Sequence, residues 1–202
     1  MQIVLATRNR DKIREIREVL AAVPVKILTL DDFPEFPEIE ETGTTLQENA
    51  VLKAVGIARF TSQAALADDS GLEIDALDGA PGVISSRYAG PGCSYDDNNR
   101  KLLEALKGIP EKERTARFRT VIAVAWNPDE VAAVEGSVEG IITVGKAGHD
   151  GFGYDPVFYY PPAGKTFAEM SLAEKNSVSH RGRALVRARE LLTQRLGNPS
   201  RG

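Results

Sequence analysis

Residues that could hold a metal-bound polyphosphate gather in four separate stretches of this 202-residue chain. The four stretches are Thr7-Arg8-Asn9 with Lys12, Glu40-Glu41, Asp68-Asp69-Ser70-Gly71, and Phe152-Gly153-Tyr154-Asp155 followed by Lys175 and Ser179-His180-Arg181. The first offers basic and hydroxyl groups for phosphate, and the next two offer carboxylates for a divalent metal. The last offers aromatic rings that can stack on a base. Together these residue types predict a site for a metal-bound nucleoside polyphosphate.

The first stretch follows a short apolar run, residues 3–6, which predicts a buried strand. Apolar side chains then recur at helical spacing between residues 13 and 23, so Thr7 and Asn9 should lie at a helix N-terminus. Free N–H groups and the helix dipole attract phosphate there, and Lys12 would add a positive charge. Simple capping of the helix by Thr7 and Asn9 is the alternative. The glycine pattern of a P-loop is absent.

The two acidic pairs occupy different kinds of segment. Asp68-Asp69 follows an apolar run, residues 64–67, that predicts a strand ending at the pair, and Ser70-Gly71 predicts a tight turn. Glu40-Glu41 lies in an acidic, proline-containing loop, residues 31–43. Mg²⁺ takes a few carboxylate oxygens and keeps several waters, so one carboxylate from each pair could hold it. A solvated loop is the alternative for Glu40-Glu41, whereas the aspartates would repel each other without a nearby cation.

The last stretch combines aromatic and basic residues. Phe152 lies in a glycine-rich loop, residues 145–153, and Tyr154 follows it, which leaves two rings available for stacking on a base. Packing of these rings on the core is the alternative. Lys175 and Ser179-His180-Arg181 precede and begin the last predicted helix, where they could contact a base edge or a phosphate, or cap that helix.

Hydrophobic periodicity and turn residues predict an α/β fold, with a mixed sheet covered by helices and divided by a cleft. Strands are expected at 3–6, 25–30, 64–67, 116–126, 131–144 and 157–160, and helices at 13–23, 45–60, 95–106 and 181–196. Thr45 and Glu48 form a possible capping box, and Asn127-Pro128-Asp129 predicts a hairpin turn. Residues 79–92 should form an irregular connection. Polar positions of the first helix, including Glu15, suit a solvated face.

Composition narrows the function classes. A net charge of −4 argues against a general nucleic-acid binder. Cys93 is the only cysteine, which excludes an intramolecular disulfide and fits a reducing compartment. The N-terminal apolar run is too short for a signal peptide, and no apolar stretch approaches the roughly 18 residues of a membrane span. We therefore expect a cytoplasmic protein that binds neither nucleic acid nor membrane.

The ordered motifs resemble the Ham1/inosine triphosphate pyrophosphatase family over nearly the whole chain. They are Ala6-Thr7-Arg8-Asn9 with Lys12, Ala67-Asp68-Asp69-Ser70-Gly71-Leu72, Gly151-Phe152-Gly153-Tyr154-Asp155-Pro156 and Ser179-His180-Arg181-Gly182. The resemblance implies an enzyme that cleans the nucleotide pool by converting ITP, dITP and XTP to the monophosphate and pyrophosphate with magnesium. It also implies a single domain over residues 1–202, elongated and two-lobed around a central cleft, and a homodimer.

The resemblance also implies roles for individual residues. The triphosphate would be bound by Thr7, Arg8, Asn9, Arg10, Asp11 and Lys12, with help from Lys53. Glu41 and Asp69 would be the metal carboxylates, with Glu40 as the alternative to Glu41, and Asp69 would be the base for the attacking water. Ser70 would contact substrate, Phe152 would stack on the purine, Gly153, Tyr154 and Asp155 would line the base site, and Lys175, His180 and Arg181 would complete it.

Two other function classes are compatible with parts of the pattern. One is a pyrophosphatase of the Maf type, with a similar fold but other nucleotides as substrates; the Phe-Gly-Tyr-Asp and Ser-His-Arg motifs argue against it. The other is a non-catalytic nucleotide-binding regulator, which would not need the pairing of Glu41 with Asp69. We expect these two carboxylates to meet around one cation.

Overall fold

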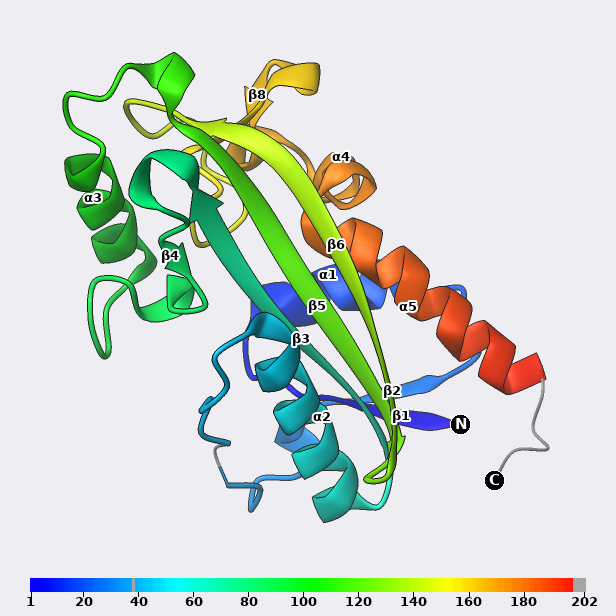
Figure 1. Cartoon of the computed structure of the whole chain (residues 1–202). Helices are drawn as coiled ribbons and strands as arrows, with labels where there is room; N and C mark the ends of the chain where they lie inside the picture. Colours follow the sequence, from blue (N-terminus) through cyan, green and yellow to red (C-terminus); the bar gives the residue numbers. More distant parts are fainter. Residues whose placement is uncertain (38, 198–202) are drawn as a thin grey trace. The chain divides into compact units, whose positions relative to one another are not determined.

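A computed structural model describes residues 1–37 and 39–197, and Figure 1 follows the chain through them. The helices are α1 (Arg10–Leu20), α2 (Leu46–Thr61), α3 (Tyr95–Ala105), α4 (Leu172–Val178) and α5 (His180–Gly197). The strands are β1 (Gln2–Leu5), β2 (Lys26–Leu28), β3 (Ala64–Ile74), β4 (Pro81–Gly82), β5 (Thr115–Asn127), β6 (Glu130–Ile142), β7 (Phe158–Tyr160) and β8 (Lys165–Thr166). No helix among the described residues combines the length and apolarity needed to cross a bilayer.

The strands form one hydrogen-bonded sheet in the order β2-β1-β3-β5-β6-β7-β8, with β4 paired to β3. The chain divides into two compact units, and β3, β5 and β6 each contribute residues to both. Unit 1 contains residues 1–69, 120–136 and 181 onward. Unit 2 contains residues 70–119 and 137–180. The predicted mixed sheet with flanking helices is confirmed.

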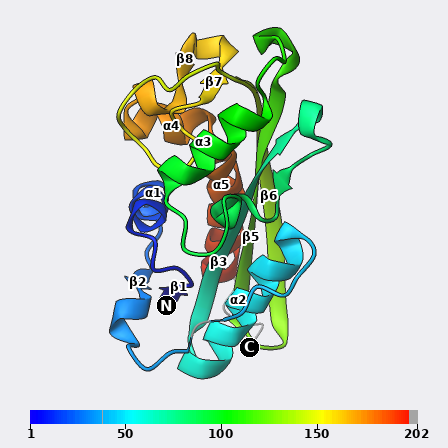
Figure 2. The ribbon, with the colours of Figure 1, turned by 90° about the vertical axis from the view of Figure 1, so that its left-hand side faces the viewer.

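Unit 1 is built on parallel strands. β1 pairs with β2 on one side and with β3 on the other, with Val4 opposite Leu28 and Ala65. Alternate residues of a strand face opposite sides of the sheet. Ile3 and Leu5 therefore pack in one cluster with the apolar faces of α1 and α5. The buried alanines of α2 come at every fourth residue, and Figures 1 and 2 show α2 and α5 on opposite sides of β3.

Unit 2 is built on antiparallel pairs. β4 pairs with the second half of β3, β7 with β6, and β8 with β7. Its core joins β3, α3, β5 and the segment after residue 150, and the largest buried side chains in it are Phe158 and Phe167. Both phenylalanines and Phe118 lie in one group of ring contacts. This core supports the glycine-rich loop that carries Phe152.

Local sequence signals predicted several elements correctly. Thr45 caps α2 and forms a capping box with Glu48. The long hairpin of β5 and β6 turns where predicted, and the Asn127 side chain accepts a hydrogen bond from the Asp129 N–H at 2.9 Å. Helix α5 agrees with its prediction to within one residue at each end.

The predicted end of the third strand is wrong. β3 does not stop at Asp68-Asp69, and Ser70-Gly71 forms no turn, because the strand continues to Ile74. Leu72 and Ile74 are fully buried, and β4 pairs with this second half of the strand. The apolar alternation and the new pairing partner keep the backbone extended past the glycine. The sequence pattern also missed α4, β8 and β4, all of which are short, and β4 lies within residues 79–92, which were predicted to be irregular.

Candidate functional site

The N-terminus of α1 is capped by its own residues. Asn9 is the N-cap, and its side chain accepts hydrogen bonds from the N–H groups of Asp11 and Lys12 at 3.0 and 3.2 Å. Thr7 accepts from the Asn9 N–H at 3.1 Å. Capping is therefore the role that the contacts demonstrate, and phosphate binding at this helix end stays a prediction. Arg8 and Arg10 are exposed on the same turn.

Lys53 forms ion pairs with two carboxylates that are distant from each other in the sequence of unit 1. Its ammonium group lies 3.0 Å from Oε1 of Glu41 and 2.9 Å from Oδ1 of Asp69, and it donates to the Asp68 carbonyl at 2.8 Å. Glu41 and Asp69 therefore lie close together on one lysine, and the expectation that they share a metal ion stays a prediction. Glu40 is exposed and Glu41 is half-buried, so Glu41 is the member of that pair that belongs to the group.

Asp68 belongs to a second, more deeply buried network. Its Oδ2 lies 3.0 Å from the Lys12 ammonium and accepts from Nε of Arg181 at 3.1 Å. Arg181 also donates to Glu15. The prediction that Glu15 faces solvent is wrong, because the residue is 2% exposed and its carboxylate pairs with a guanidinium from α5. A buried carboxylate on a helix face needs such a partner.

The pKa values of the two adjacent aspartates, Asp68 and Asp69, are shifted in opposite directions. At Asp68, burial would raise the pKa, but three neighbouring cations outweigh it and hold the pKa well below the ordinary range. The three cations are Lys12, Arg181 and Lys53. At Asp69, burial outweighs the attraction of Lys53 and raises the pKa above its ordinary value of 3.8. A carboxylate with a raised pKa accepts a proton more readily, so Asp69 suits a general base better than Asp68 does.

Replacing Lys53 by methionine should raise the pKa of Asp69 further in the metal-free protein. The lysine is the strongest influence that lowers this pKa, and without it burial and Glu41 are opposed only by Lys12. Carbon-13 NMR of the aspartate carboxyl groups during a pH titration measures the shift. Replacing the exposed Lys26 by methionine is the control and should leave the titration unchanged. A lowered pKa of Asp69 in the Lys53→Met protein would contradict this account.

The donor set of unit 1 fits magnesium bound together with a phosphate ligand. Within residues 1–37 and 39–197, no cluster of three or more histidine, cysteine, aspartate or glutamate side chains is placed to hold a metal by itself. Magnesium in nucleotide sites uses one or two carboxylates and takes its other ligands from phosphates and water. Glu41 and Asp69 contact the same ammonium group and so can supply this pair. Magnesium binding stays a prediction.

In unit 2, Asp155 organises the predicted base-binding loop. Its carboxylate accepts a hydrogen bond from the Phe152 N–H at 2.7 Å and from the Lys175 ammonium at 2.5 Å. The Lys175 ammonium also lies 4.7 Å from the centre of the Phe152 ring. Tyr95 contacts the same ring, with 5.9 Å between the ring centres. Phe152 is half-buried, so part of its surface remains accessible.

The prediction of two available aromatic rings is wrong for Tyr154. The residue is 5% exposed within the core of unit 2, and its hydroxyl donates to the Ser85 carbonyl at 2.9 Å. The imidazole of His180 is also buried, and it stacks on Phe118 with 4.5 Å between the ring centres. These two side chains therefore stabilise the framework around the loop, and their predicted contacts with a base are not visible in this arrangement.

Gly151 is required by the position of Asp155. Its φ is +73°, and a Cβ atom there would lie 2.1 Å from Oδ2 of Asp155. Replacing Gly151 by alanine should both strain the backbone and displace the carboxylate that holds Phe152 and Lys175. We expect a loss of more than about 2 kcal/mol of stability, since a left-handed alanine alone costs roughly 1–2 kcal/mol. Urea unfolding measures the loss.

Two other glycines of this loop distinguish backbone strain from displacement of Asp155 as the cause of the stability loss. Gly153 has a φ of +63°, and a Cβ atom added there would meet nothing within 4 Å, so Gly153→Ala tests backbone strain alone. Gly145 has open space and no positive φ, so Gly145→Ala should be nearly neutral. A Gly151→Ala loss no larger than that of Gly153→Ala would show that the Asp155 contact contributes little.

Asn99 is a supporting residue that the sequence pattern did not reveal. It lies inside α3, and its side-chain amide donates to the Gly153 carbonyl at 2.8 Å. The neighbouring Asn98 accepts from the Ala89 N–H at 2.7 Å. Asparagine is unfavourable inside helices, so two consecutive asparagines in a predicted helix were an available signal. Both are 2% exposed, and they hold the backbone at Ala89 and at Gly153 against α3.

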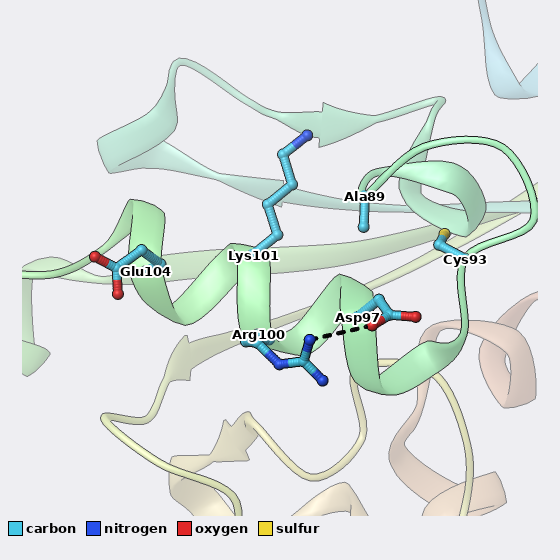
Figure 3. Close-up of a pocket in the computed structure, with 6 residues that line it drawn as sticks. All are labelled: Ala89, Cys93, Asp97, Arg100, Lys101 and Glu104. Carbon is cyan, nitrogen blue, oxygen red and sulfur yellow. Dashed lines mark hydrogen bonds and ion pairs between the residues drawn. The ribbon is translucent and has the colours of Figure 1, made fainter.

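None of the predicted site residues lines a pocket that lies beside α3. It is lined by Ala89, Cys93, Asp97, Arg100, Lys101 and Glu104, which Figure 3 shows along α3 and the segment before it. The cations in this pocket already have partners. Arg100 pairs with Asp97 at 3.3 Å, and the Lys101 ammonium lies over the Tyr88 ring at 4.4 Å.

Known proteins match the chain over almost its full length. The model of the Ham1 family matches residues 3–191. A dITP/XTP pyrophosphatase from Desulforamulus reducens is 50% identical over 194 residues, which cover 96% of each chain. One from Geobacter sulfurreducens is 49% identical, over 97% of this chain and 96% of that one. The structure of a HAM1 protein from Coxiella burnetii has a TM-score of 0.88 and 44% identity, over 96% of this chain and 99% of that one.

Proposed function

This chain belongs to the Ham1 family, and we propose that it hydrolyses ITP, dITP and XTP to the nucleoside monophosphate and pyrophosphate. The relatives are named dITP/XTP pyrophosphatases, and the family match covers the stretches that hold the candidate site residues. The observation that carries the proposal in the structure is the contact of Lys53 with both Glu41 and Asp69. It brings a candidate base and a second carboxylate to one place.

The reaction is attack of water on the α-phosphorus with departure of pyrophosphate. Asp69 accepts the proton of the attacking water, a role that its raised pKa favours. Lys53 orients Asp69 through the 2.9 Å contact between its ammonium group and Oδ1. Asp68 is held ionised between Lys12 and Arg181 and so is poorly suited to take the proton. Lysine charge near the phosphates offsets the charge that develops on pyrophosphate.

We also propose that magnesium is the cofactor, held by Glu41 and Asp69 together with the substrate phosphates. Bound magnesium would neutralise phosphate charge and favour ionisation of a water molecule. Glu41 is half-buried and lies at the end of an acidic loop, so its carboxylate remains accessible to a metal-bound substrate. In this arrangement Lys53 would keep the two carboxylates close together when the metal is absent.

Base recognition would depend on the Phe152 loop of unit 2. The purine would stack on the Phe152 ring, and the Lys175 ammonium, 4.7 Å from the centre of that ring, is a donor at the same place. Hypoxanthine and xanthine present an oxygen acceptor at C6, whereas adenine presents a donor. With adenine, the Lys175 ammonium would face a donor in place of an acceptor, and such a mismatch costs orders of magnitude in discrimination.

A nucleotide panel assayed with and without magnesium tests the proposed function. We expect pyrophosphate release from ITP, dITP and XTP, turnover of ATP lower by at least about 100-fold, and loss of activity after chelation. Equal rates for ITP and ATP would contradict the base-reading role. A preference for other nucleotides would favour a pyrophosphatase of the Maf type. Binding of ITP without hydrolysis would identify a nucleotide-binding regulator.

We further propose that the protein acts as a homodimer in the cytoplasm. The family resemblance supports the dimer, and the single cysteine, Cys93, which forms no disulfide, supports a reducing compartment. Light scattering coupled to size-exclusion chromatography measures the mass in solution. A mass close to the 21.9 kDa of one chain at micromolar concentration would contradict the dimer.

A further inference from the structure

Asn49 is a buried polar residue of α2 with an asymmetric set of contacts. It is fully buried in the first turns of the helix. Its Oδ1 accepts a hydrogen bond from the Gly43 N–H at 2.8 Å. Its Nδ2 is also buried and has no hydrogen-bond partner among the described residues. Because Nδ2 can only donate, the Gly43 N–H fixes which end of the amide faces the loop.

Gly43 is held tightly against the helix. A Cβ atom at this position would lie 2.6 Å from Oδ1 of Asn49 and 2.7 Å from Cβ of Glu48. Both distances are too short for a real side chain, so the loop backbone approaches the helix as closely as a glycine permits. Asn49 therefore fixes the position of the loop at this residue as well as satisfying its N–H group.

The same helix holds the same loop at a second point. Lys53 lies one helical turn after Asn49, on the same face, and contacts the side chain of Glu41 at 3.0 Å. Glu41 precedes Gly43 by two residues, and the Thr42 N–H donates to the Glu40 carbonyl at 3.1 Å. The loop is therefore held to α2 at two points. The Gly43 backbone is bound by Asn49, and the Glu41 carboxylate is bound by the Lys53 ammonium.

We propose that Asn49 is a positioning residue that holds Glu41 beside Asp69 and so sets the affinity of the site for a divalent metal. This inference rests on the proposed function, which gives Glu41 to the metal. An unpaired buried donor destabilises a fold, and a leucine of similar shape would avoid that cost. The contact with Gly43 is what the amide provides and a leucine cannot.

The Asn49→Leu protein tests this inference, because it keeps the volume and removes the acceptor. We expect the Mg²⁺ concentration for half-maximal ITP hydrolysis to rise about 10-fold or more, which is typical when a partner of a metal ligand is lost. The turnover at saturating Mg²⁺ should stay within about threefold of the parent, because no group that contacts the substrate is removed. Direct Mn²⁺ binding in the presence of a saturating non-hydrolysable ITP analogue, measured by water proton relaxation, should weaken by the same factor as the Mg²⁺ response.

Two matched variants distinguish positioning from general loosening of the helix end. Gly43→Ala breaks the same contact from the loop side and should weaken Mn²⁺ binding in the same way. Thr45→Ala removes the capping bond to the Glu48 N–H, which measures 3.1 Å, and leaves the Gly43 contact intact. It should lower the unfolding temperature and leave Mn²⁺ binding unchanged.

Each outcome bears on the inference. Unchanged Mn²⁺ binding in Asn49→Leu, or equal weakening in Thr45→Ala, would overturn it while leaving the proposed function intact. A parent protein that binds no Mn²⁺ and hydrolyses ITP without divalent metal would overturn the magnesium proposal, and this inference with it. Weaker binding in Asn49→Leu and Gly43→Ala, but not in Thr45→Ala, would support it.

Discussion

Replacement of Asp69 by asparagine is expected to lower the turnover of ITP by about 100- to 10,000-fold, the usual contribution of a general base. Asparagine has nearly the same shape and can still accept a hydrogen bond from Lys53 through its side-chain oxygen. It cannot take a proton from water. Steady-state kinetics at saturating Mg²⁺ measure the loss, and the unfolding temperature should fall by no more than a few degrees.

The control for this experiment is Asp129→Asn. Asp129 is exposed in the β5–β6 turn, where aspartate and asparagine are equally suited to the backbone. This variant should retain parental kinetics. An Asp69→Asn protein with turnover close to the parent would remove Asp69 as the base. A loss of activity accompanied by unfolding would instead assign it a structural role.

Replacement of Arg181 by methionine is expected to cost about 3–5 kcal/mol of stability, because it leaves two buried carboxylates without their shared partner. Those carboxylates belong to Glu15 and Asp68, and Arg181 itself is 2% exposed. Urea unfolding near pH 7 measures the effect. A double variant that also changes Glu15 to methionine should recover part of the loss, since it removes the buried Glu15 carboxylate while Asp68 keeps its ion pair with Lys12.

The pH dependence of stability gives a second readout. Asp68 has a depressed pKa in the folded protein, so its stabilising contribution is present above 3.8 and is lost as the pH falls below that value. Removing Arg181 takes away one of the cations that depress this pKa. Acid unfolding of Arg181→Met should therefore begin at a higher pH than that of the parent.

A surface ion pair provides the comparison for Arg181. Arg100 pairs with Asp96 at 3.1 Å, but its side chain is 71% exposed. Exposed pairs contribute about 0–1 kcal/mol, so Arg100→Met should change stability little. A similar loss in the two methionine variants would show that burial of the Arg181 network is not what makes it costly to break.

Short-range patterns in the chain predicted much of the local structure. The capping box of Thr45 and Glu48, the Asn127-Pro128-Asp129 turn and the apolar periodicity of α5 each depend on neighbours within a few residues. The ordered motifs also identified the family, and the comparisons confirm it. Such signals succeed because capping, turn formation and amphipathic packing are decided by contacts inside one element.

Only the tertiary structure determined which polar side chains contact each other and which of them are buried. Glu15 looked like a surface residue because its partner, Arg181, is distant in sequence. Tyr154 looked available for stacking, but the core of unit 2 encloses its ring.

The sequence by itself determined the family, the kinds of side chain in the candidate site and most helices and strands. All of these depend on residue identity and on spacing along the chain. Only the fold determined the partners of the two aspartates. Asp68 forms ion pairs with Lys12 and Arg181, whereas Asp69 shares the Lys53 ammonium with Glu41. Two adjacent aspartates point to opposite faces of an extended strand. Which face holds which cations depends on the helices that pack there, and no local pattern contains that information.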